Sequence, residues 1–420
     1  MLVLLALRPA LVGAQAPSIH PLTADLRVNG RDGILRKGQK AVVTVHLYNT
    51  GPYVTRGQLR CTVATGDRVG LAQKTEPVAL PAGGTVTATI RYRPRRAGFY
   101  RAEFEWVVGH DTLRGFTWFG YRPESIQSPL TRPPDFRVYW QKAKADLAAI
   151  PPDFSVQPNP EYTTTQRVVY TVEMRSLDNA LIRGYYVVPR SGGPFPAVLR
   201  LPGYYEHLVP KPEWEGFAVL YLNIRGHGNS RDDVPADAPL IARNIADKDR
   251  YFYRGAYLDC LRAVDFLCSR PEVDTARVAV AGGSQGGALS IATAALDKRI
   301  KYCLPDMPFL SDFRQYFRIA SFPVNNLAEY QKRHPELTWA QMHATLDYVD
   351  VKNLAPWVHC PVLLSVGLRD TICPPAINLS AYNQLHVPKE LRVYPGSGHK
   401  VPPAQYAYKE AWLRKRLGLE

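Results

Sequence analysis

The chain has 420 residues, of which 46% are hydrophobic, 11% aromatic and 21% charged. This length exceeds the roughly 100–200 residues of a typical domain, and the apolar content excludes a long disordered or fibrous protein, so we expect two globular domains. The formal net charge of +15 favours contact with a polyanionic surface, but the basic residues are scattered and accompany no nucleic-acid-binding motif, so no nucleic acid partner is expected.

Residues 1–16 have the pattern of a signal peptide. An apolar stretch ends in Ala14-Gln15-Ala16, which is an A-x-A cleavage pattern, although a basic region before the apolar stretch is missing. We expect the mature protein to be exported to the periplasm, the cell surface or the medium. No later stretch reaches the roughly 18 consecutive apolar residues of a membrane-spanning helix, so no transmembrane span is expected.

Residues 24–122 alternate apolar and polar side chains with a period of two, which is the pattern of strands with one face toward a core. Turn sequences such as the one at 49–52 separate the alternating runs at the spacing of an antiparallel sandwich. The segment resembles the immunoglobulin-like modules attached to bacterial surface enzymes, so we expect an immunoglobulin-like β-sandwich. It contains no constellation of residues suited to catalysis, and we interpret it as a spacer or a docking surface.

A proline-rich linker is expected at 123–134, followed by a catalytic domain at 135–420. Asp135 has the position of a helix cap, and apolar residues follow it at helical spacing as far as Pro151. Beyond this helix, short apolar runs bounded by turn residues alternate with helical patterns. This alternation predicts an α/β domain with a mostly parallel sheet flanked by helices.

The sequence GGSQGG at 282–287 lies between an apolar run at 278–281 and a helical pattern at 288–296. A G-x-S-x-G motif between a strand and a helix is the nucleophile elbow of the α/β-hydrolase fold, where a strained turn exposes the serine hydroxyl. The motif alone is a weak signal because Gly and Ser are common in turns. Its position between a strand and a helix is what indicates Ser284 as a nucleophile.

A serine nucleophile needs a histidine base, and the base needs an acid that orients it. In the α/β-hydrolase fold both groups follow the serine in the chain, with the acid first, each in a loop after a strand. Asp370 follows the apolar run at 361–366, and His399 follows the next run. We therefore predict a triad of Ser284, Asp370 and His399, with Asp306, which follows an earlier run, as an alternative acid.

Ester hydrolysis also requires N–H donors for the developing oxyanion, usually the amide after the nucleophile and one from an earlier loop. Gln285 follows the nucleophile and supplies the first donor. We expect the second donor in the loop at 202–205 and assign it to the backbone of Tyr204. The turn at 225–230, after the next strand, is expected to shape the wall of the site rather than to take part in catalysis.

No metal ion or cofactor is expected. The six cysteines form no C-x-x-C pair and the histidines do not cluster with them, so a structural zinc site has little support. Residues 305–354 are rich in aromatic side chains and too long for a plain connection between strands, which favours a cap over the active site or an ordinary packed insertion.

Motifs from about Pro134 onward match one enzyme family. They are Gly203-Tyr204, Arg225-Gly226-x-Gly228, Tyr253-Arg254-Gly255-x-Tyr257-x-Asp259, Gly283-Ser284-Gln285-Gly286-Gly287, Ser365-Val366-Gly367-Leu368-x-Asp370, Cys373-Pro374-Pro375 and Gly398-His399. In these the chain resembles the acetyl xylan esterases and cephalosporin C deacetylases of carbohydrate esterase family seven. The resemblance implies Ser284 as nucleophile, Asp370 as acid, His399 as base, and the amides of Tyr204 and Gln285 as oxyanion donors. Two positions depart from the family pattern: Lys400 replaces a usually acidic residue, and Tyr205 a common glycine.

The resemblance implies a serine esterase that removes acetyl groups from acetylated sugars or xylo-oligosaccharides through an acyl-enzyme. Similar enzymes assemble as hexamers, so a homo-oligomer is possible, although the added sandwich could block that arrangement. Two alternatives stay open. One is a serine peptidase of the same fold, and the other is a non-catalytic carbohydrate-binding surface protein, which would not need three triad residues in the correct order.

Overall fold

The computed structural model describes residues 18–419 apart from 20, 233–237 and 321, so the expected signal peptide lies outside the described residues. Among the described residues, no helix has both the length and the apolar composition needed to cross a membrane. The described chain divides into two compact units. One comprises the residues up to Ser125 together with Tyr394–Gly398, and the other comprises Ile126–Val393 and the residues from His399 on.

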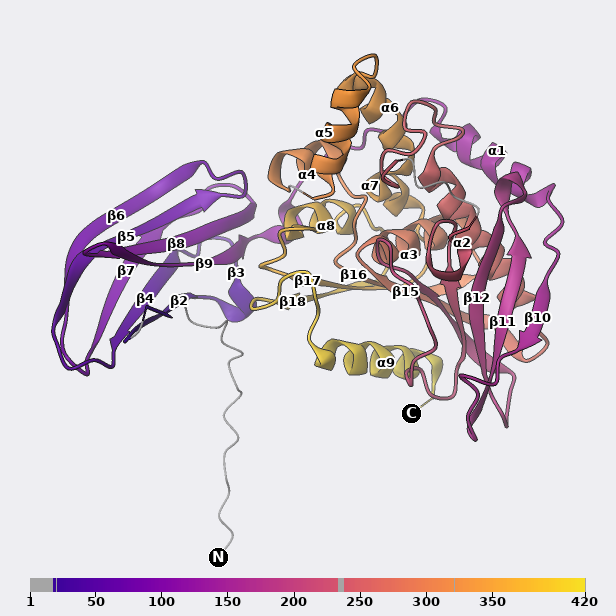
Figure 1. Cartoon of the computed structure of the whole chain (residues 1–420), viewed down its shortest axis with the longest axis horizontal. Coiled ribbons are helices and arrows are strands. Elements are labelled where there is room, and N and C mark those ends of the chain that lie inside the picture. The colour runs from indigo at the N-terminus through magenta and orange to yellow at the C-terminus, as the bar shows by residue number, and fades with distance from the viewer. Residues whose placement is uncertain (1–17, 20, 233–237, 321, 420) are drawn as a thin grey trace, which may run out of the picture. The chain divides into compact units, whose positions relative to one another are not determined.

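The first unit is a sandwich of two β-sheets (Figure 1). The strands of the four-stranded sheet are, in order, β1 (Ser18–Ile19), β2 (Leu22–Val28), β4 (Ala41–Asn49) and β7 (Thr85–Tyr92). Those of the five-stranded sheet are β3 (Ile34–Leu35), β9 (Asp111–Tyr121), β8 (Gly98–Val108), β5 (Thr55–Thr65) and β6 (Gly70–Leu80). One core joins the inward side chains of both sheets, such as Val45 and Trp106. The apolar and polar side chains alternate in the sequence because each strand turns one face toward this core and the other toward solvent.

The second unit is built on a nine-stranded sheet. Its strands are, in order, β10 (Ser155–Pro158), β11 (Arg167–Arg175), β12 (Leu181–Pro189), β14 (Ala218–Asn223), β13 (Phe195–Leu201), β15 (Val273–Gly283), β16 (Ile300–Asp306), β17 (Val362–Gly367) and β18 (Lys389–Tyr394). β10, β11, β12 and β14 pair antiparallel in turn, whereas β14, β13, β15, β16 and β17 pair parallel. Every residue of β13 and β14 is buried, which explains their continuous apolar runs in the sequence. The predicted mostly parallel sheet is confirmed.

Helices cover both faces of this sheet (Figure 1). On one face lies α9 (Pro403–Leu417), whose Trp412 and Leu413 pack in a core with strand residues such as Val198 and Leu304. On the other face lie α2 (Phe252–Cys268) and α3 (Gln285–Leu296). The remaining α-helices are α1 (Phe136–Ala148), α4 (Phe313–Ile319), α5 (Val324–Arg333), α6 (Trp339–Val349), α7 (Val351–Leu354) and α8 (Pro375–Tyr382). Short 3-10 helices lie at Arg31–Gly33, Pro123–Ser125, Leu177–Asn179, Gly228–Ser230 and Ala355–Trp357.

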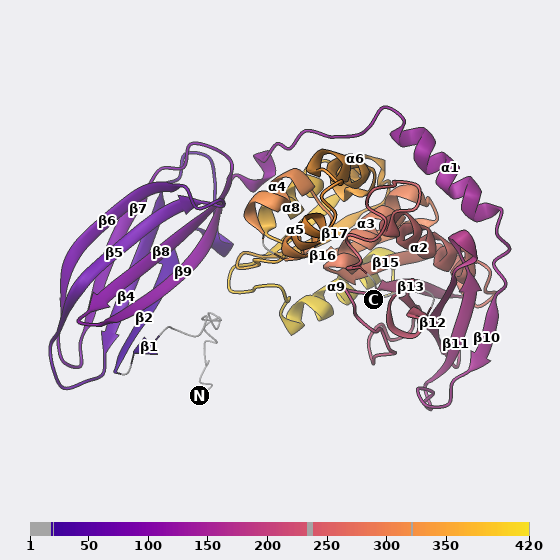
Figure 2. The same cartoon turned by 45° about the horizontal axis from the view of Figure 1, so that its top comes forward.

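The long connection between β16 and β17 forms a helical insertion that carries α4, α5, α6 and α7, and the first three of these helices are labelled in Figure 2. Its aromatic side chains pack mainly on one another, as with Phe317 and Trp339, whose ring centroids are 5.6 Å apart. The ring of Tyr204, from the loop after β13, lies 6.3 Å from that of Phe309 and 6.1 Å from that of Phe322. The insertion therefore contacts the loop that the sequence assigns to oxyanion binding.

A buried ion pair fastens α9 to the end of β16. The Asp306 carboxylate contacts the Lys409 ammonium, and it also accepts hydrogen bonds from Ser365 Oγ at 2.6 Å and Gln405 Nε2 at 3.2 Å. Both charged side chains are almost fully buried. A buried charge is tolerated when it is paired and hydrogen-bonded, and removing one partner leaves the other uncompensated.

We expect Lys409→Met to lower the free energy of unfolding by about 3–5 kcal/mol, because it leaves the Asp306 carboxylate buried without its counter-charge. The matched control is Lys332→Met on α5, which removes an exposed ion pair with Glu329 and should change stability little. Urea denaturation of both variants measures the difference. Equal losses in the two variants would contradict the role given to the buried pair.

Candidate active site

Ser284 occupies the turn between β15 and α3 with a φ of 56° and a ψ of −119°. This conformation is strained for a residue with a Cβ and costs about 1–3 kcal/mol. Three backbone hydrogen bonds hold it. The Ser284 N–H donates to Asp306 O at 3.0 Å, and Ser284 O accepts from the N–H of Ala288 at 3.1 Å and of Phe309 at 3.0 Å. The strain is thus maintained by the neighbouring strand end and by the first turn of α3.

Two glycines leave the room that this turn requires. A Cβ on Gly282 would lie 2.5 Å from the backbone of Gly286, and a Cβ on Gly286 would lie 2.3 Å from the carbonyl oxygen of Leu201 in β13. Both distances are too short for any side chain. The glycines of the motif therefore let α3 start directly against the neighbouring strand, as a nucleophile elbow requires.

The three residues predicted as a triad are hydrogen-bonded in the expected order. His399 Nε2 lies 3.0 Å from Ser284 Oγ, and His399 Nδ1 lies 2.9 Å from Asp370 Oδ2. The other carboxylate oxygen of Asp370 accepts from the backbone N–H groups of Ile372 at 2.9 Å and Cys373 at 2.8 Å. With the proton on Nδ1 directed at Asp370, the Nε2 lone pair faces the Ser284 hydroxyl and can accept its proton.

The alternative acid, Asp306, does not have this position. Its carboxylate is occupied by Lys409, Ser365 and Gln405, and its backbone carbonyl holds the Ser284 N–H. Asp370 is the carboxylate that reaches the His399 ring. Asp306 supports the turn on which Ser284 stands and is not the partner of the base.

Tyr204 and Gln285 follow two adjacent parallel strands, β13 and β15, whose ends pair at Leu201 and Gly282. Among the described residues, no hydrogen-bond acceptor lies on the backbone N–H of Tyr204 or of Gln285. The N–H of Gln285 is also the first of helix α3, where backbone donors have no partner within the helix. Both amides thus remain available for an anionic ligand, which is what an oxyanion site requires.

Cys373 lies beside Ser284, with its Sγ 4.0 Å from Ser284 Oγ. Burial raises the pKa of this thiol well above its ordinary value, so it stays protonated and is a poor nucleophile. All six cysteines are free, and the described residues contain no group of three or more His, Cys, Asp or Glu side chains able to hold a metal ion.

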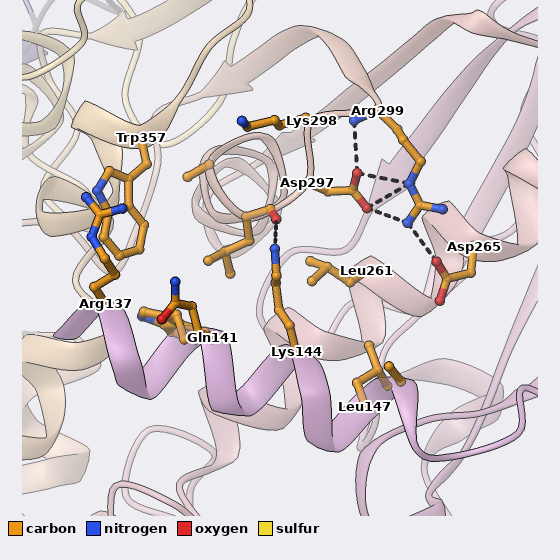
Figure 3. A pocket seen from close by; sticks show the side chains of 14 residues that line it. Arg137, Gln141, Lys144, Leu147, Leu261, Asp265, Asp297, Lys298, Arg299 and Trp357 are labelled. Carbon is orange, nitrogen blue, oxygen red and sulfur yellow. Dashed lines mark hydrogen bonds and ion pairs between the residues drawn. The ribbon is translucent and has the colours of Figure 1, made fainter. Parts of the chain in front are cut away.

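A hollow of about 680 Å³ lies away from the triad residues, between α1, the C-terminal ends of α2 and α3, and Trp357 (Figure 3). Its two carboxylates are both bound to Arg299, with Nη2 at 2.6 Å from Asp265 and 2.5 Å from Asp297. Lys144 donates to the last carbonyl of α3, Leu296 O, at 3.1 Å. The residues that line this hollow include no serine, cysteine or histidine, so it is not a rival to the triad.

His227, in the turn that the sequence assigns to the wall of the site, is fully buried. Its ring nitrogens contact the Gln285 side chain and the backbone of Tyr205 and Arg225. Burial lowers the pKa of His227 to about 4, although the carbonyl of Arg225 and the carboxylate of Asp259 act in the opposite direction. The ring is therefore neutral at neutral pH.

Comparison with known proteins gives a consistent set of relatives. The family model of acetyl xylan esterase (AXE1) matches residues 120–416. The acetyl esterase Axe7A of Xylanibacter ruminicola is 27% identical over 398 residues, which cover 88% of each chain. The acetyl xylan esterase of Paenibacillus sp. R4 is 32% identical with a TM-score of 0.64, covering 70% of this chain and 98% of that one. Acetyl xylan esterase 1 of Thermoanaerobacterium sp. JW/SL YS485 is 28% identical with a TM-score of 0.65, covering 70% and 97%.

The burial of His227 predicts a pH-dependent contribution to stability. Between about pH 6.5, where an unfolded histidine titrates, and about pH 4, the unfolded chain binds the proton more readily than the folded chain. The contribution is therefore present above pH 6.5 and is lost as the pH falls to 4, in total about 3 kcal/mol. His227→Gln removes the titrating group, so the stability of wild type minus that of the variant should fall by this amount between pH 7 and pH 4. A difference that does not change with pH would contradict the neutral ring.

Proposed function

Because the chain belongs to the acetyl xylan esterase family and is a carboxylic ester hydrolase of the α/β-hydrolase fold, we propose that it removes acetyl groups from acetylated xylan or xylo-oligosaccharides with Ser284 as nucleophile. The observation that carries this proposal is the hydrogen-bonded series Ser284, His399 and Asp370 at the end of β15. The substrate class rests on the relatives, whose names describe acetyl and acetyl xylan esterases.

Acylation begins when Ser284 Oγ attacks the acetyl carbonyl carbon while His399 Nε2 takes the hydroxyl proton. The buried Asp370 carboxylate holds the imidazole in the required tautomer and stabilises the imidazolium that forms. The backbone N–H groups of Tyr204 and Gln285 bind the oxyanion of the tetrahedral intermediate. The His399 imidazolium then gives its proton to the sugar oxygen, which leaves as an alcohol, and the acetyl group stays on Ser284.

Deacylation repeats these steps with water in place of the serine. His399 Nε2 takes a proton from water, whose oxygen attacks the acetyl carbon of acetyl-Ser284, and the same two amides bind the second oxyanion. The proton returns from His399 to Ser284 Oγ as acetate leaves. The His399 side chain is 25% exposed, which is compatible with access of water to the ring.

Export is part of the proposal, because a polymeric plant polysaccharide is met outside the cytoplasm and residues 1–16 have the pattern of a signal peptide. Expression of the full chain in a bacterial host tests it. We expect the enzyme recovered outside the cytoplasm to have a mass lower than that of the full chain by the leader. Full-length enzyme confined to the cytoplasm would overturn the inference.

Ser284→Ala should lose nearly all hydrolysis of a soluble acetyl ester, because loss of a triad nucleophile costs about 10⁶ in kcat in a well-studied serine hydrolase. The control is Ser269→Ala, at the C-terminal end of α2, which should keep wild-type turnover. Turnover of both purified variants, with circular dichroism to verify folding, gives the answer. A folded Ser284→Ala variant that kept a tenth of the activity would exclude Ser284 as nucleophile.

Asp370→Asn should mainly lower the turnover of the enzyme, whereas Asp306→Asn should mainly lower its stability. Asp370→Asn lowers kcat by about 10⁴, because the amide favours the wrong tautomer of His399, while the fold persists. Asp306→Asn leaves Lys409 buried without its counter-charge, so it should lower the melting temperature far more than the turnover of the remaining folded enzyme. Measuring kcat and Tm for both variants separates the two roles, and the reverse pattern would assign the acid to Asp306.

The substrate class is tested by acetate release from acetylated xylan, measured beside cleavage of a panel of dipeptide amides. We expect acetate release that depends on Ser284, and amide cleavage no faster than that of the Ser284→Ala variant. Efficient amide cleavage with little acetate release would favour a peptidase of the same fold. Binding to xylan without any release would favour a non-catalytic carbohydrate-binding protein.

A further inference from the structure

We propose that His227 is a positioning residue for the oxyanion site, whose neutral ring holds the loop at 202–205 and the Gln285 side chain so that the N–H groups of Tyr204 and Gln285 face the reacting carbonyl. The inference rests on the proposed function, since it concerns the same site. His227 is not part of the triad, and no hydrogen bond joins it to Ser284 or His399 among the described residues.

The hydrogen bonds of the His227 ring fit a single tautomer. Nε2 lies 2.9 Å from Gln285 Nε2 and 3.2 Å from the backbone nitrogen of Tyr205, and both of these groups are donors. Nε2 must therefore be the unprotonated acceptor. Nδ1 lies 3.1 Å from the carbonyl oxygen of Arg225, so it carries the proton and donates. One neutral tautomer satisfies all three contacts, whereas a proton on Nε2 would face two donors.

The orientation of the Gln285 side-chain amide is determined by its surroundings. Its Oε1 accepts from the hydroxyl of the buried Tyr253 at 2.9 Å. Its Nε2 faces the carbonyl oxygens of Pro202 at 3.4 Å and Gly203 at 3.3 Å, as well as the His227 ring. A flipped amide would place its oxygen against two carbonyls. The residue whose backbone begins α3 therefore also binds, through its side chain, the loop that carries Tyr204.

These contacts determine where the Tyr204 N–H points. In a trans peptide the C=O and N–H are directed oppositely, so turning the Gly203 carbonyl toward Gln285 turns the Tyr204 N–H away from that side chain. The following N–H, of Tyr205, is held by His227. Tyr205 has a φ of 59°, a left-handed conformation that a non-glycine residue adopts at a cost. The bond to His227 helps to keep this peptide in place.

The His227 ring is itself held in a closed setting. Its carbonyl partner belongs to Arg225, which forms a two-pronged ion pair with the buried Asp259 of α2 at 2.8 and 2.9 Å. The rings of Tyr205 and Phe252 lie over its faces at 6.3 and 6.4 Å. The charged groups that act on the ring are the carboxylates of Asp259 and Glu206 and the guanidinium of Arg231, besides the nearby Arg225. The His227 ring therefore links the loop at 202–205 to α2, through Arg225 and Asp259.

Two substitutions at the same position test the inference. His227→Phe keeps a flat ring but removes the acceptor, and His227→Gln supplies a carbonyl oxygen that can accept from the same donors. Loss of a whole oxyanion donor costs about 10²–10³ in kcat, so a displaced donor should cost about 10- to 100-fold. We expect His227→Phe to lower kcat and kcat/KM together by that factor with KM unchanged, and His227→Gln to stay within about five-fold of wild type.

Three further measurements make the test decisive. The exposed His359→Phe is the control substitution and should retain wild-type kinetics. A phosphonate that forms a tetrahedral adduct with Ser284 should label His227→Phe more slowly by a similar factor, because the adduct places an oxyanion in the same site. Nitrogen-15 NMR of the wild-type enzyme should show an unprotonated Nε2 and a protonated Nδ1 at His227, assigned by the loss of these signals in His227→Gln.

The inference is overturned if folded His227→Phe keeps kcat within two-fold of wild type, if the Phe and Gln variants are equally impaired, or if wild-type His227 carries its proton on Nε2. The NMR result decides the matter if His227→Phe does not fold. The Ser284→Ala variant shows whether a negative result concerns only the positioning role of His227 or the proposed function as a whole. If Ser284→Ala is inactive while His227→Phe is fully active, only the positioning role is wrong, whereas an active Ser284→Ala variant removes the proposed function itself.

Discussion

The positive φ of Ser284 is the constraint on which the site depends. A serine held in this conformation stands at the apex of the turn, where its hydroxyl is free of the backbone hydrogen bonds that occupy β15 and α3. The conformation persists because Gly282 and Gly286 leave room for it and because the end of β16 holds the serine amide. The strain is local, but the groups that maintain it come from β15, β16, the loop after β16 and α3.

The sheet brings the remaining groups to this turn. Tyr204 follows β13, Asp370 follows β17 and His399 follows β18, so the loops after neighbouring strands supply every group of the proposed mechanism. Ligand sites of open α/β sheets lie at the carboxyl ends of the strands for this reason. The Asp306–Lys409 pair adds a second tie, because it anchors the helix that follows the His399 loop to the strand end that holds Ser284.

His399 and His227 lie in different environments, and these environments fit the different roles proposed for the two residues. His399 is partly exposed, and its ring contacts a carboxylate through Nδ1 and a hydroxyl through Nε2, which are the contacts that the proposed base requires. His227 is fully buried, its hydrogen-bond partners are all uncharged groups, and burial lowers its pKa to about 4. Burial without a directly bonded counter-charge disfavours the protonated ring. A neutral ring suits the role proposed for His227, which is to accept hydrogen bonds from Gln285 and Tyr205 and keep them in place.

The sequence by itself determined the change from a β-sandwich to an α/β unit, the elbow around Ser284 and the order Ser284, Asp370, His399. These are local properties, since side-chain period follows from backbone geometry and the elbow requires glycines at set positions. The sequence favoured Asp370 as the acid but left Asp306 open as an alternative, because both follow buried strands. Only the packing of α9, which brings Lys409 onto Asp306, decided between them. The sequence also predicted only that the turn with His227 shapes the wall of the site. The role proposed for this ring depends on hydrogen-bond partners from distant segments, which meet only in the folded chain.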